Sequence, residues 1–125
     1  MAIQFDVTVS DRPGELGKLA AALAERGVNI DAIAAVTGGG SGYVCVLPRE
    51  PLKARETLRA AGFAFVERTV VTVTLEDRPG TLGDLAKRLG AAGVNVTSIV
   101  TLTSGGGRVQ LALGVDNLDK ARRVV

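Results

Sequence analysis

A ten-residue segment that begins with Asp-Arg-Pro-Gly occurs twice in the chain, as DRPGELGKLA at residues 11–20 and as DRPGTLGDLA at residues 77–86. Each copy follows an alternating apolar run typical of a strand and opens an apolar pattern typical of a helix. Glycine leaves the backbone bare, so the N–H groups at the start of this helix can approach a ligand closely. The helix dipole adds roughly half a positive charge at the same end. The repeated turn is therefore suited to hold a small anion.

The carboxylate of a free amino acid fits this turn better than a nucleotide phosphate. The turn lacks the lysine and serine of a Walker motif, and it lacks the G-x-G-x-x-G spacing. The alternative is a plain connection from strand to helix, in which proline starts the helix and glycine relieves crowding. Because both copies retain the aspartate, the arginine and both glycines, the repetition favours binding.

Two asparagines, Asn29 and Asn95, are the second candidate feature. Both follow the Gly-Val pair after a predicted helix and open the next strand. An amide donates and accepts hydrogen bonds, so it could read an ammonium and a carboxylate together. The alternative is that the amide completes the turn by bonding to its own backbone, and spacing does not separate the two interpretations. Asp31, with Asp11 or Asp77, could hold an ammonium group, although Asp11 could equally cap its helix.

The elements that position these residues come from an internal duplication. Residues 11–36 and 77–102 align at a constant offset of 66, with 13 identities in 26 positions. Chance does not produce such identity without a gap, so the chain is predicted to contain two domains, 1–68 and 69–125. No linker rich in proline, glycine or serine separates the copies, and we therefore expect them to pack against each other.

The first copy is predicted to contain six elements. A strand at 3–9 precedes a helix whose apolar stripe includes Leu16, Leu19 and Leu23, and Gly27 ends this helix. Glycine-rich turns such as GGGSG join the strands of a hairpin. The remaining predicted elements are strands at 28–36 and 43–47, a helix at 51–61 with Leu52 and Leu58 facing inward, and a strand at 63–66.

The second copy repeats this order, with Leu82 in the place of Leu16. Its elements are predicted at 71–75, 82–89, 94–102, 109–113 and 117–125, so its fourth strand is expected to be missing or to lie beyond the given chain. The order βαββαβ predicts an α+β fold class. We expect two ferredoxin-like repeats packed side by side into one extended antiparallel sheet, with the helices on one face.

In this frame the motif DRPG(E/T)LG..A..L...GVN(I/V) resembles the ACT domain, the small regulatory module of amino-acid metabolism, over nearly the whole chain. The tandem resembles a stand-alone double-ACT protein without an attached enzyme. This resemblance implies allosteric binding of a free amino acid at the interface between paired domains. It implies chemically unequal sites, because Glu15 aligns with Thr81 and Asp31 with Thr97. The implied ligand-binding residues are Asp11, Pro13, Gly14, Glu15 and Leu16 with Asn95 at one site, and Asp77, Pro79, Gly80, Thr81 and Leu82 with Asn29 at the other.

Composition limits the other classes of function. The chain has 15 Lys+Arg against 13 Asp+Glu and a net charge of +2, which argues against binding to a nucleic-acid backbone. With no histidine and with Cys45 as the single cysteine, neither a zinc site nor an intrachain disulfide is expected. No apolar run approaches the roughly 18 residues of a membrane span. We therefore expect a cytoplasmic protein that has no metal or cofactor and does not bind a membrane.

Two rival classes share the predicted frame. Acylphosphatase-like catalysis is disfavoured, because the chain has no histidine and no close pair of carboxylates for acid and base roles. RNA recognition is disfavoured, because the third strands GYVCVL and RVQLAL lack a ladder of aromatic side chains. We predict a non-enzymatic regulatory protein that binds a free amino acid, forms a homodimer and acts on a metabolic enzyme or regulator. The alternative is a ligand-free dimerisation or interaction module that regulates a partner protein.

Overall fold

The computed structural model describes residues 2–125, which divide into two compact units. The N-terminal unit is Ile3–Arg68, and the C-terminal unit is Thr69–Val125 with Ala2. Strand β4, Ala64–Glu76, runs through this boundary without a break. The prediction of two separate strands here was wrong, because no turn-forming residue interrupts the segment and its β-branched residues favour an extended backbone.

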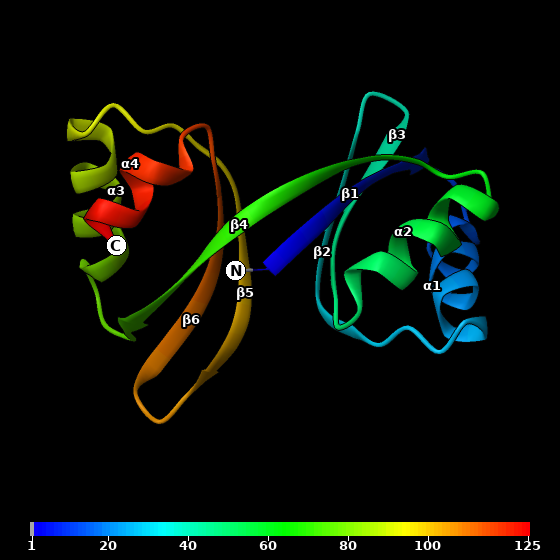
Figure 1. The fold of residues 1–125 in the computed structure, drawn as a ribbon, viewed down its shortest axis with the longest axis horizontal. Coiled ribbons are helices and arrows are strands. Elements are labelled where there is room, and N and C mark those ends of the chain that lie inside the picture. Colours follow the sequence, from blue (N-terminus) through cyan, green and yellow to red (C-terminus); the bar gives the residue numbers. More distant parts are fainter. Residues whose placement is uncertain (1) are drawn as a thin grey trace. The chain divides into compact units, whose positions relative to one another are not determined.

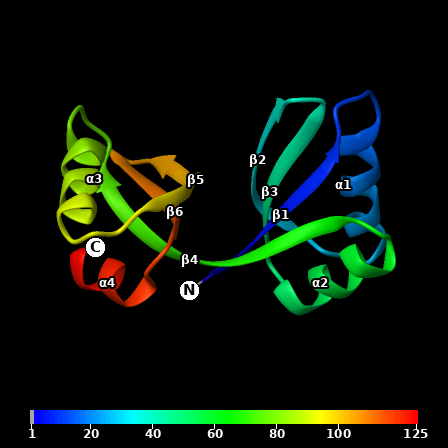
Figure 2. The same ribbon diagram turned by 90° about the horizontal axis from the view of Figure 1, so that it is seen from above.

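The N-terminal unit has its strands in the order β2-β3-β1-β4. Strand β3 pairs antiparallel with both β1 and β2. Figures 1 and 2 show both helices of this unit on one face of its sheet. Its elements are β1 Ala2–Ser10, α1 Glu15–Glu25, β2 Ile30–Gly38, β3 Ser41–Pro48, α2 Pro51–Ala60 and the first part of β4.

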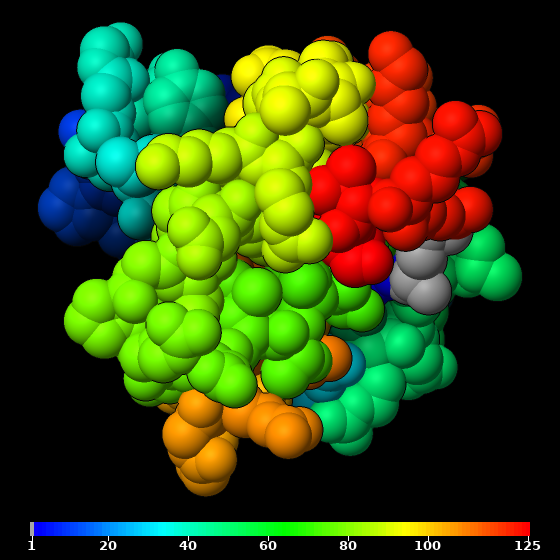
Figure 3. Space-filling model, turned by 90° about the vertical axis from the view of Figure 1, so that its left-hand side faces the viewer, coloured from blue at the N-terminus to red at the C-terminus, as the bar shows by residue number. Residues whose placement is uncertain are grey.

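The C-terminal unit has its strands in the order β4-β6-β5, and both pairings are antiparallel. Its helices α3 and α4 lie against each other on the outer surface of the unit (Figure 3). The elements are the second part of β4, α3 Thr81–Ala91, β5 Val96–Gly105, β6 Arg108–Val115 and α4 Leu118–Val124. Because β4 is shared, all six strands belong to one sheet, and the predicted α+β fold class with ferredoxin-like repeats is confirmed.

The second strand of each repeat begins two residues later than predicted, at Ile30 and Val96. The preceding valines, Val28 and Val94, are buried in the core. Their N–H groups donate to the carbonyl oxygens of the last core leucine of each helix, at 2.9 Å in both repeats. These valines therefore close the helices and do not start the strands.

Each core lies between the sheet and its helices. In the N-terminal unit, alternate residues of β1 and β3 meet the inward side chains of α1 and α2, and Phe5 packs edge-on against Phe65 with 5.7 Å between ring centroids. Leu58 is buried as predicted, whereas Leu52 is 68% exposed, so its predicted inward orientation was wrong. Among residues 2–125, no helix is long and apolar enough to span a membrane.

Two leucines that the predicted helical stripes placed in the core lie outside it. Leu16 is 51% exposed and Leu82 is 45% exposed, whereas Leu19 and Leu85 are 1% exposed. Core contacts begin one helical turn after the start of each helix, which leaves the first-turn leucines beside the DRPG turn. Both repeats therefore present an exposed leucine at the same place.

Candidate functional site

The DRPG turn has the same backbone conformation in both repeats. Gly14 has φ 90° and ψ −13°, and Gly80 has φ 95° and ψ −18°, which is the left-handed region. A Cβ at either glycine would meet no atom within 4 Å. The backbone conformation, and not crowding, therefore requires glycine at these positions.

Both helices begin directly after these glycines, at Glu15 and Thr81. Pro13 and Pro79 consequently precede the first helical turn, in contrast to the alternative in which proline starts the helix. No side chain caps the N-terminal N–H groups of either helix, so the alternative in which Asp11 acts as a cap is wrong. The N–H groups of Glu15 and Thr81 donate to the carbonyl oxygens of Arg12 and Arg78 at 3.5 Å. The next two N–H groups of each helix have no partner within residues 2–125 and remain suited to an anion.

The two aspartates of the turns keep their carboxylates unengaged. Within residues 2–125, the side chains of Asp11 and Asp77 have no hydrogen-bond or ion-pair partner. Their backbone N–H groups instead tie the turns to the neighbouring hairpins. The Asp11 N–H donates to the carbonyl oxygen of Gly40 at 3.1 Å, and the Asp77 N–H donates to that of Gly107 at 2.9 Å.

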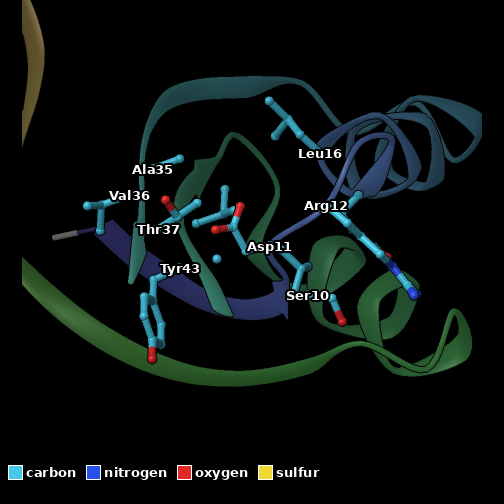
Figure 4. A pocket seen from close by; sticks show the side chains of 12 residues that line it. Ser10, Asp11, Arg12, Leu16, Ala35, Val36, Thr37 and Tyr43 are labelled. Atoms are coloured by element: carbon cyan, nitrogen blue, oxygen red, sulfur yellow. The ribbon is translucent and has the colours of Figure 1, made fainter. Parts of the chain in front are cut away.

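A pocket with a volume of about 180 Å³ lies beside Asp11 in the N-terminal unit. The end of β1, the first turn of α1 and the β2–β3 hairpin form its walls. Figure 4 shows the Asp11 carboxylate pointing between these walls, with Leu16 on the α1 side, whereas the Arg12 side chain extends away. The predicted residues Asp11, Glu15 and Leu16 therefore come together around one cavity.

Glu15 also lines this pocket, but its charge is already balanced. Its carboxylate accepts a hydrogen bond from Arg12 Nε at 2.7 Å and lies 3.8 Å from Lys18 Nζ. The hydrogen bond from Arg12 is the main reason that the pKa of Glu15 lies below its ordinary value. Glu15 is therefore ionised and paired, whereas Asp11 offers an unpaired negative charge to a ligand.

The second turn has a different side-chain arrangement. The Thr81 hydroxyl donates to the carbonyl oxygens of Glu76 and Arg78, at 2.8 and 3.2 Å respectively. Arg78 turns back to pair with Glu76 at 2.6 Å, and this hydrogen bond lowers the pKa of Glu76. Because Thr81 aligns with Glu15, the C-terminal repeat has no carboxylate at this position.

The asparagines lie at the opposite ends of the helices from the turns. Asn29 follows α1, and its Nδ2 donates to Asp31 Oδ1 at 2.9 Å. Asp31 also accepts hydrogen bonds from Arg49, at 2.9 and 3.1 Å, so its charge is balanced. Asn95 follows α3, and its backbone N–H donates to Asp116 Oδ1 at 2.9 Å. Neither repeat by itself brings its asparagine to its own turn.

Sequence reasoning missed the sheet side of the pocket. Val9, Ala35, Val36, Thr37 and Tyr43 line it, although none was predicted to bind a ligand. The signal was present, because a tight glycine-rich hairpin places the residues that flank it opposite each other. Val36 and Tyr43 are indeed partners in the β2–β3 register.

The sequence model of the ACT domain family matches residues 3–61 and 69–123 of the chain. The chain belongs to the ACT domain family. The two matched segments confirm the predicted tandem of ACT domains, and the ACT domain is a regulatory domain.

Solved structures resemble the ACT tandem over nearly all of its length. Protein BT0572 from Bacteroides thetaiotaomicron has a TM-score of 0.87 and 23% identity, covering 98% of this chain and 85% of its own. The ligand-free regulatory subunit of aspartate kinase from Thermus thermophilus has a TM-score of 0.70 and 20% identity, with coverages of 98% and 88%. E. coli aspartokinase III in complex with aspartate and ADP has a TM-score of 0.57 and 13% identity, with coverages of 98% and 30%. No curated protein sequence matches the chain.

Proposed function

We propose that this protein is a non-enzymatic regulator that binds a free amino acid at the DRPG turns of two ACT domains, residues 1–68 and 69–125. The observation that carries the proposal is the unpaired Asp11 carboxylate beside an uncapped helix start and an open pocket. The α-ammonium group of the ligand binds Asp11, and its α-carboxylate binds the N–H groups at the start of α1. The turn thereby satisfies both charges of a zwitterion.

An asparagine from another repeat completes each proposed site. Within one repeat, the 11 residues of α1 separate Asn29 from the DRPG turn, which corresponds to about 16 Å along the helix axis. The asparagine amide therefore needs a second ACT domain to reach a ligand at a turn. In this proposal Asn95 completes the first site, in which the ligand also contacts Pro13, Gly14, Glu15 and Leu16. Asn29 completes the second site, in which the ligand also contacts Pro79, Gly80, Thr81 and Leu82.

The regulatory role follows from differential affinity. A ligand that binds one arrangement of the domains more tightly shifts the population toward it, and that shift changes which surfaces a partner can bind. The fold shared with an aspartate kinase regulatory subunit and with an aspartokinase solved with aspartate supports regulation by an amino acid. We propose a cytoplasmic homodimer that acts on an enzyme or regulator of amino-acid metabolism.

Thermal unfolding of the chain with each of the twenty proteinogenic amino acids tests this function. A ligand at about 100 times its dissociation constant adds about 2.7 kcal/mol to the free energy of unfolding, which raises Tm by several degrees. The double variant Asp11→Asn, Asp77→Asn keeps the shape of both turns and removes their charge, so the increase in Tm should disappear. If no amino acid raises Tm of the unmodified protein, the sensor function is refuted.

A ligand-free interaction module is the second candidate, and one observation favours it. Ile33 on β2 and Ile99 on β5 occupy equivalent positions, and both are 46% exposed. Each strand lies at an edge of its unit, where unpaired backbone groups can accept another chain. Light scattering on the variant Ile33→Thr, Ile99→Thr would support this function if the oligomer dissociates while no amino acid binds the unmodified protein.

A further inference from the structure

The pocket beside Asp11 has apolar side chains that the N-terminal unit does not bury. Val36 is 65% exposed, Leu16 is 51% exposed and Tyr43 is 46% exposed. All three line the same cavity, together with Val9 at the end of β1. Exposed apolar side chains here surround the unpaired Asp11 carboxylate, the paired Glu15 carboxylate and a few hydroxyl groups. This is the composition of a ligand pocket, in which apolar walls surround a few polar groups.

Strand register identifies the corresponding residues of the C-terminal repeat. Val36 pairs with Tyr43 across β2 and β3, whereas Thr103 pairs with Gln110 across β5 and β6. At these paired positions the second repeat has a hydroxyl and an amide, with Leu102 inserted beside Thr103 at a register shift that the first repeat lacks here. The two repeats offer different surroundings to a side chain bound beside the turn.

The first repeat has a glycine where the second repeat has a valine. Val9 pairs with Gly42 across β1 and β3, and Gly42 lines the pocket. The equivalent pair in the C-terminal repeat is Leu75 with Val109, across β4 and β6. Gly42 lets the Val9 side chain pack against the strand, since a Cβ on Gly42 would lie 3.0 Å from Val9 Cγ2. The valine of the second repeat adds a side chain at this position, so the surroundings of the two turns differ in shape.

We propose that the pocket of the first repeat selects an amino acid with an aliphatic side chain, such as valine, isoleucine or leucine, and that the second repeat does not bind this ligand. The inference rests on the proposed function and specifies the ligand class of the same site. An apolar cavity of about 150 Å³ is large enough for benzene. A pocket of about 180 Å³ therefore has room for a branched aliphatic side chain.

The selectivity follows from what each candidate side chain would bury. Each buried methylene is worth about 0.8 kcal/mol, which corresponds to about a fourfold gain in affinity. Threonine has the shape of valine but brings a hydroxyl against the Val36 and Leu16 side chains, and an apolar surface disfavours such an isostere by about a hundredfold at most. Aspartate and lysine would bring a charge against the same wall, which is less favourable still.

Isothermal titration of the 125-residue chain with L-valine, L-isoleucine, L-leucine, L-threonine, L-aspartate and L-lysine tests the ligand class. We expect the aliphatic amino acids to bind, with valine at least about tenfold tighter than threonine. Threonine, aspartate or lysine binding as tightly as valine would overturn the inference while the proposed function stands. Heat from none of these six, while another amino acid raises Tm, would overturn it in the same way.

A matched pair of leucine variants locates the site. Leu16→Ala removes a leucine from the pocket, whereas Leu52→Ala removes an exposed leucine of α2 that does not line it, and neither leucine is buried in the core. We expect Leu16→Ala to weaken valine binding about tenfold or more and Leu52→Ala to leave it unchanged. Equal losses in both variants, or a loss in Leu52→Ala alone, would overturn the assignment to this pocket.

A wall exchange tests selectivity without removing the turn. The double variant Val36→Thr, Tyr43→Gln gives the first repeat the polar pair found in the second repeat, and both positions are exposed enough to accept polar side chains. We expect its ratio of valine to threonine affinity to fall to about one. A ratio that stays at the value of the unmodified protein, with an unchanged Tm, would show that this wall does not select the ligand.

Discussion

Gly14 and Gly17 lie one helical turn apart at the start of α1, yet only Gly14 has a positive φ. A Cβ at Gly17 would meet no atom within 4 Å, so neither backbone conformation nor packing among the described residues requires glycine there. Gly80 and Gly83 show the same contrast in α3. A glycine inside a helix costs about 1 kcal/mol relative to alanine. A ligand that approaches the helix backbone closely would explain why both repeats carry this cost.

Alanine at these two glycines should change stability in opposite directions. Gly14→Ala forces a Cβ into the left-handed region and should lower the free energy of unfolding by about 1–2 kcal/mol. Gly17→Ala improves helix propensity without a steric clash and should raise the free energy of unfolding by up to about 1 kcal/mol. Urea denaturation measures both changes.

The same variants should act alike on ligand binding. Gly14→Ala distorts the turn, and Gly17→Ala places a methyl group where the proposed ligand approaches the N–H groups of α1. Titration with the amino acid that raises Tm should show weaker binding for both. If Gly17→Ala stabilises the protein and binds as tightly as the unmodified protein, no ligand lies against this part of the helix.

The hairpin glycine that holds the turn provides a second prediction. Gly40 has φ 83° and accepts the hydrogen bond from the Asp11 N–H, so a side chain there strains the backbone that positions the turn. Gly40→Ala should lower the free energy of unfolding by about 1–2 kcal/mol and weaken amino-acid binding. Gly38→Ala is the control, because Gly38 ends β2 without a positive φ and a Cβ there meets no atom within 4 Å. Equal binding by the two variants would show that the hairpin does not position the turn.

Local patterns in the sequence were sufficient to predict the elements and the duplication. Alternation predicted β1 and the second part of β4, and helical spacing predicted α1 and α3, because both patterns report which side chains face the core. The glycine-rich turn predicted the hairpin of β2 and β3. The junction was predicted less well. A strand that serves both units carries no local sign of the change of unit, so β4 was predicted as two strands.

The candidate site was predicted on its helix side and missed on its sheet side. The DRPG turn stands out because its residues are adjacent in the sequence and require an unusual conformation. Val36 and Tyr43 look like ordinary strand residues, and only the register of the hairpin shows that they face each other beside the turn. Leu16 was predicted twice, as a core residue and as a ligand contact, and its 51% exposure excludes the first role.

Stability in acid should depend on the pair of Arg55 and Glu67, which joins α2 to β4. The guanidinium donates to both carboxylate oxygens, at 2.6 and 2.8 Å, and these hydrogen bonds lower the pKa of Glu67. Because folding lowers the pKa of Glu67, the ion pair stabilises the folded protein at pH values above the pKa of the unfolded state, near 4.5. This stabilisation is lost as the pH falls through the pKa of the folded state. Glu67→Gln should therefore flatten the fall in the free energy of unfolding below about pH 4.5.

Glu25→Gln is the control, because Glu25 has no ion-pair partner within residues 2–125. An unchanged acid profile in Glu67→Gln would contradict this role.

The thiol of Cys45 should be unreactive in the folded protein. Burial is the main cause that raises its pKa to about 11, and a hydrogen bond with Asp6, its register partner on β1, adds to the effect. The thiolate is the nucleophile, so at about pH 8 only about one thiol in a thousand can react, compared with about a quarter for an ordinary cysteine. Iodoacetamide should therefore modify the folded chain at least about a hundredfold more slowly than the chain in urea, as mass spectrometry can measure.

Asp6→Asn should speed the reaction in the folded state, because it removes a negative charge that opposes ionisation while Arg68, which favours ionisation, remains. Similar rates in the folded and unfolded chains would show that the sheet does not protect the thiol.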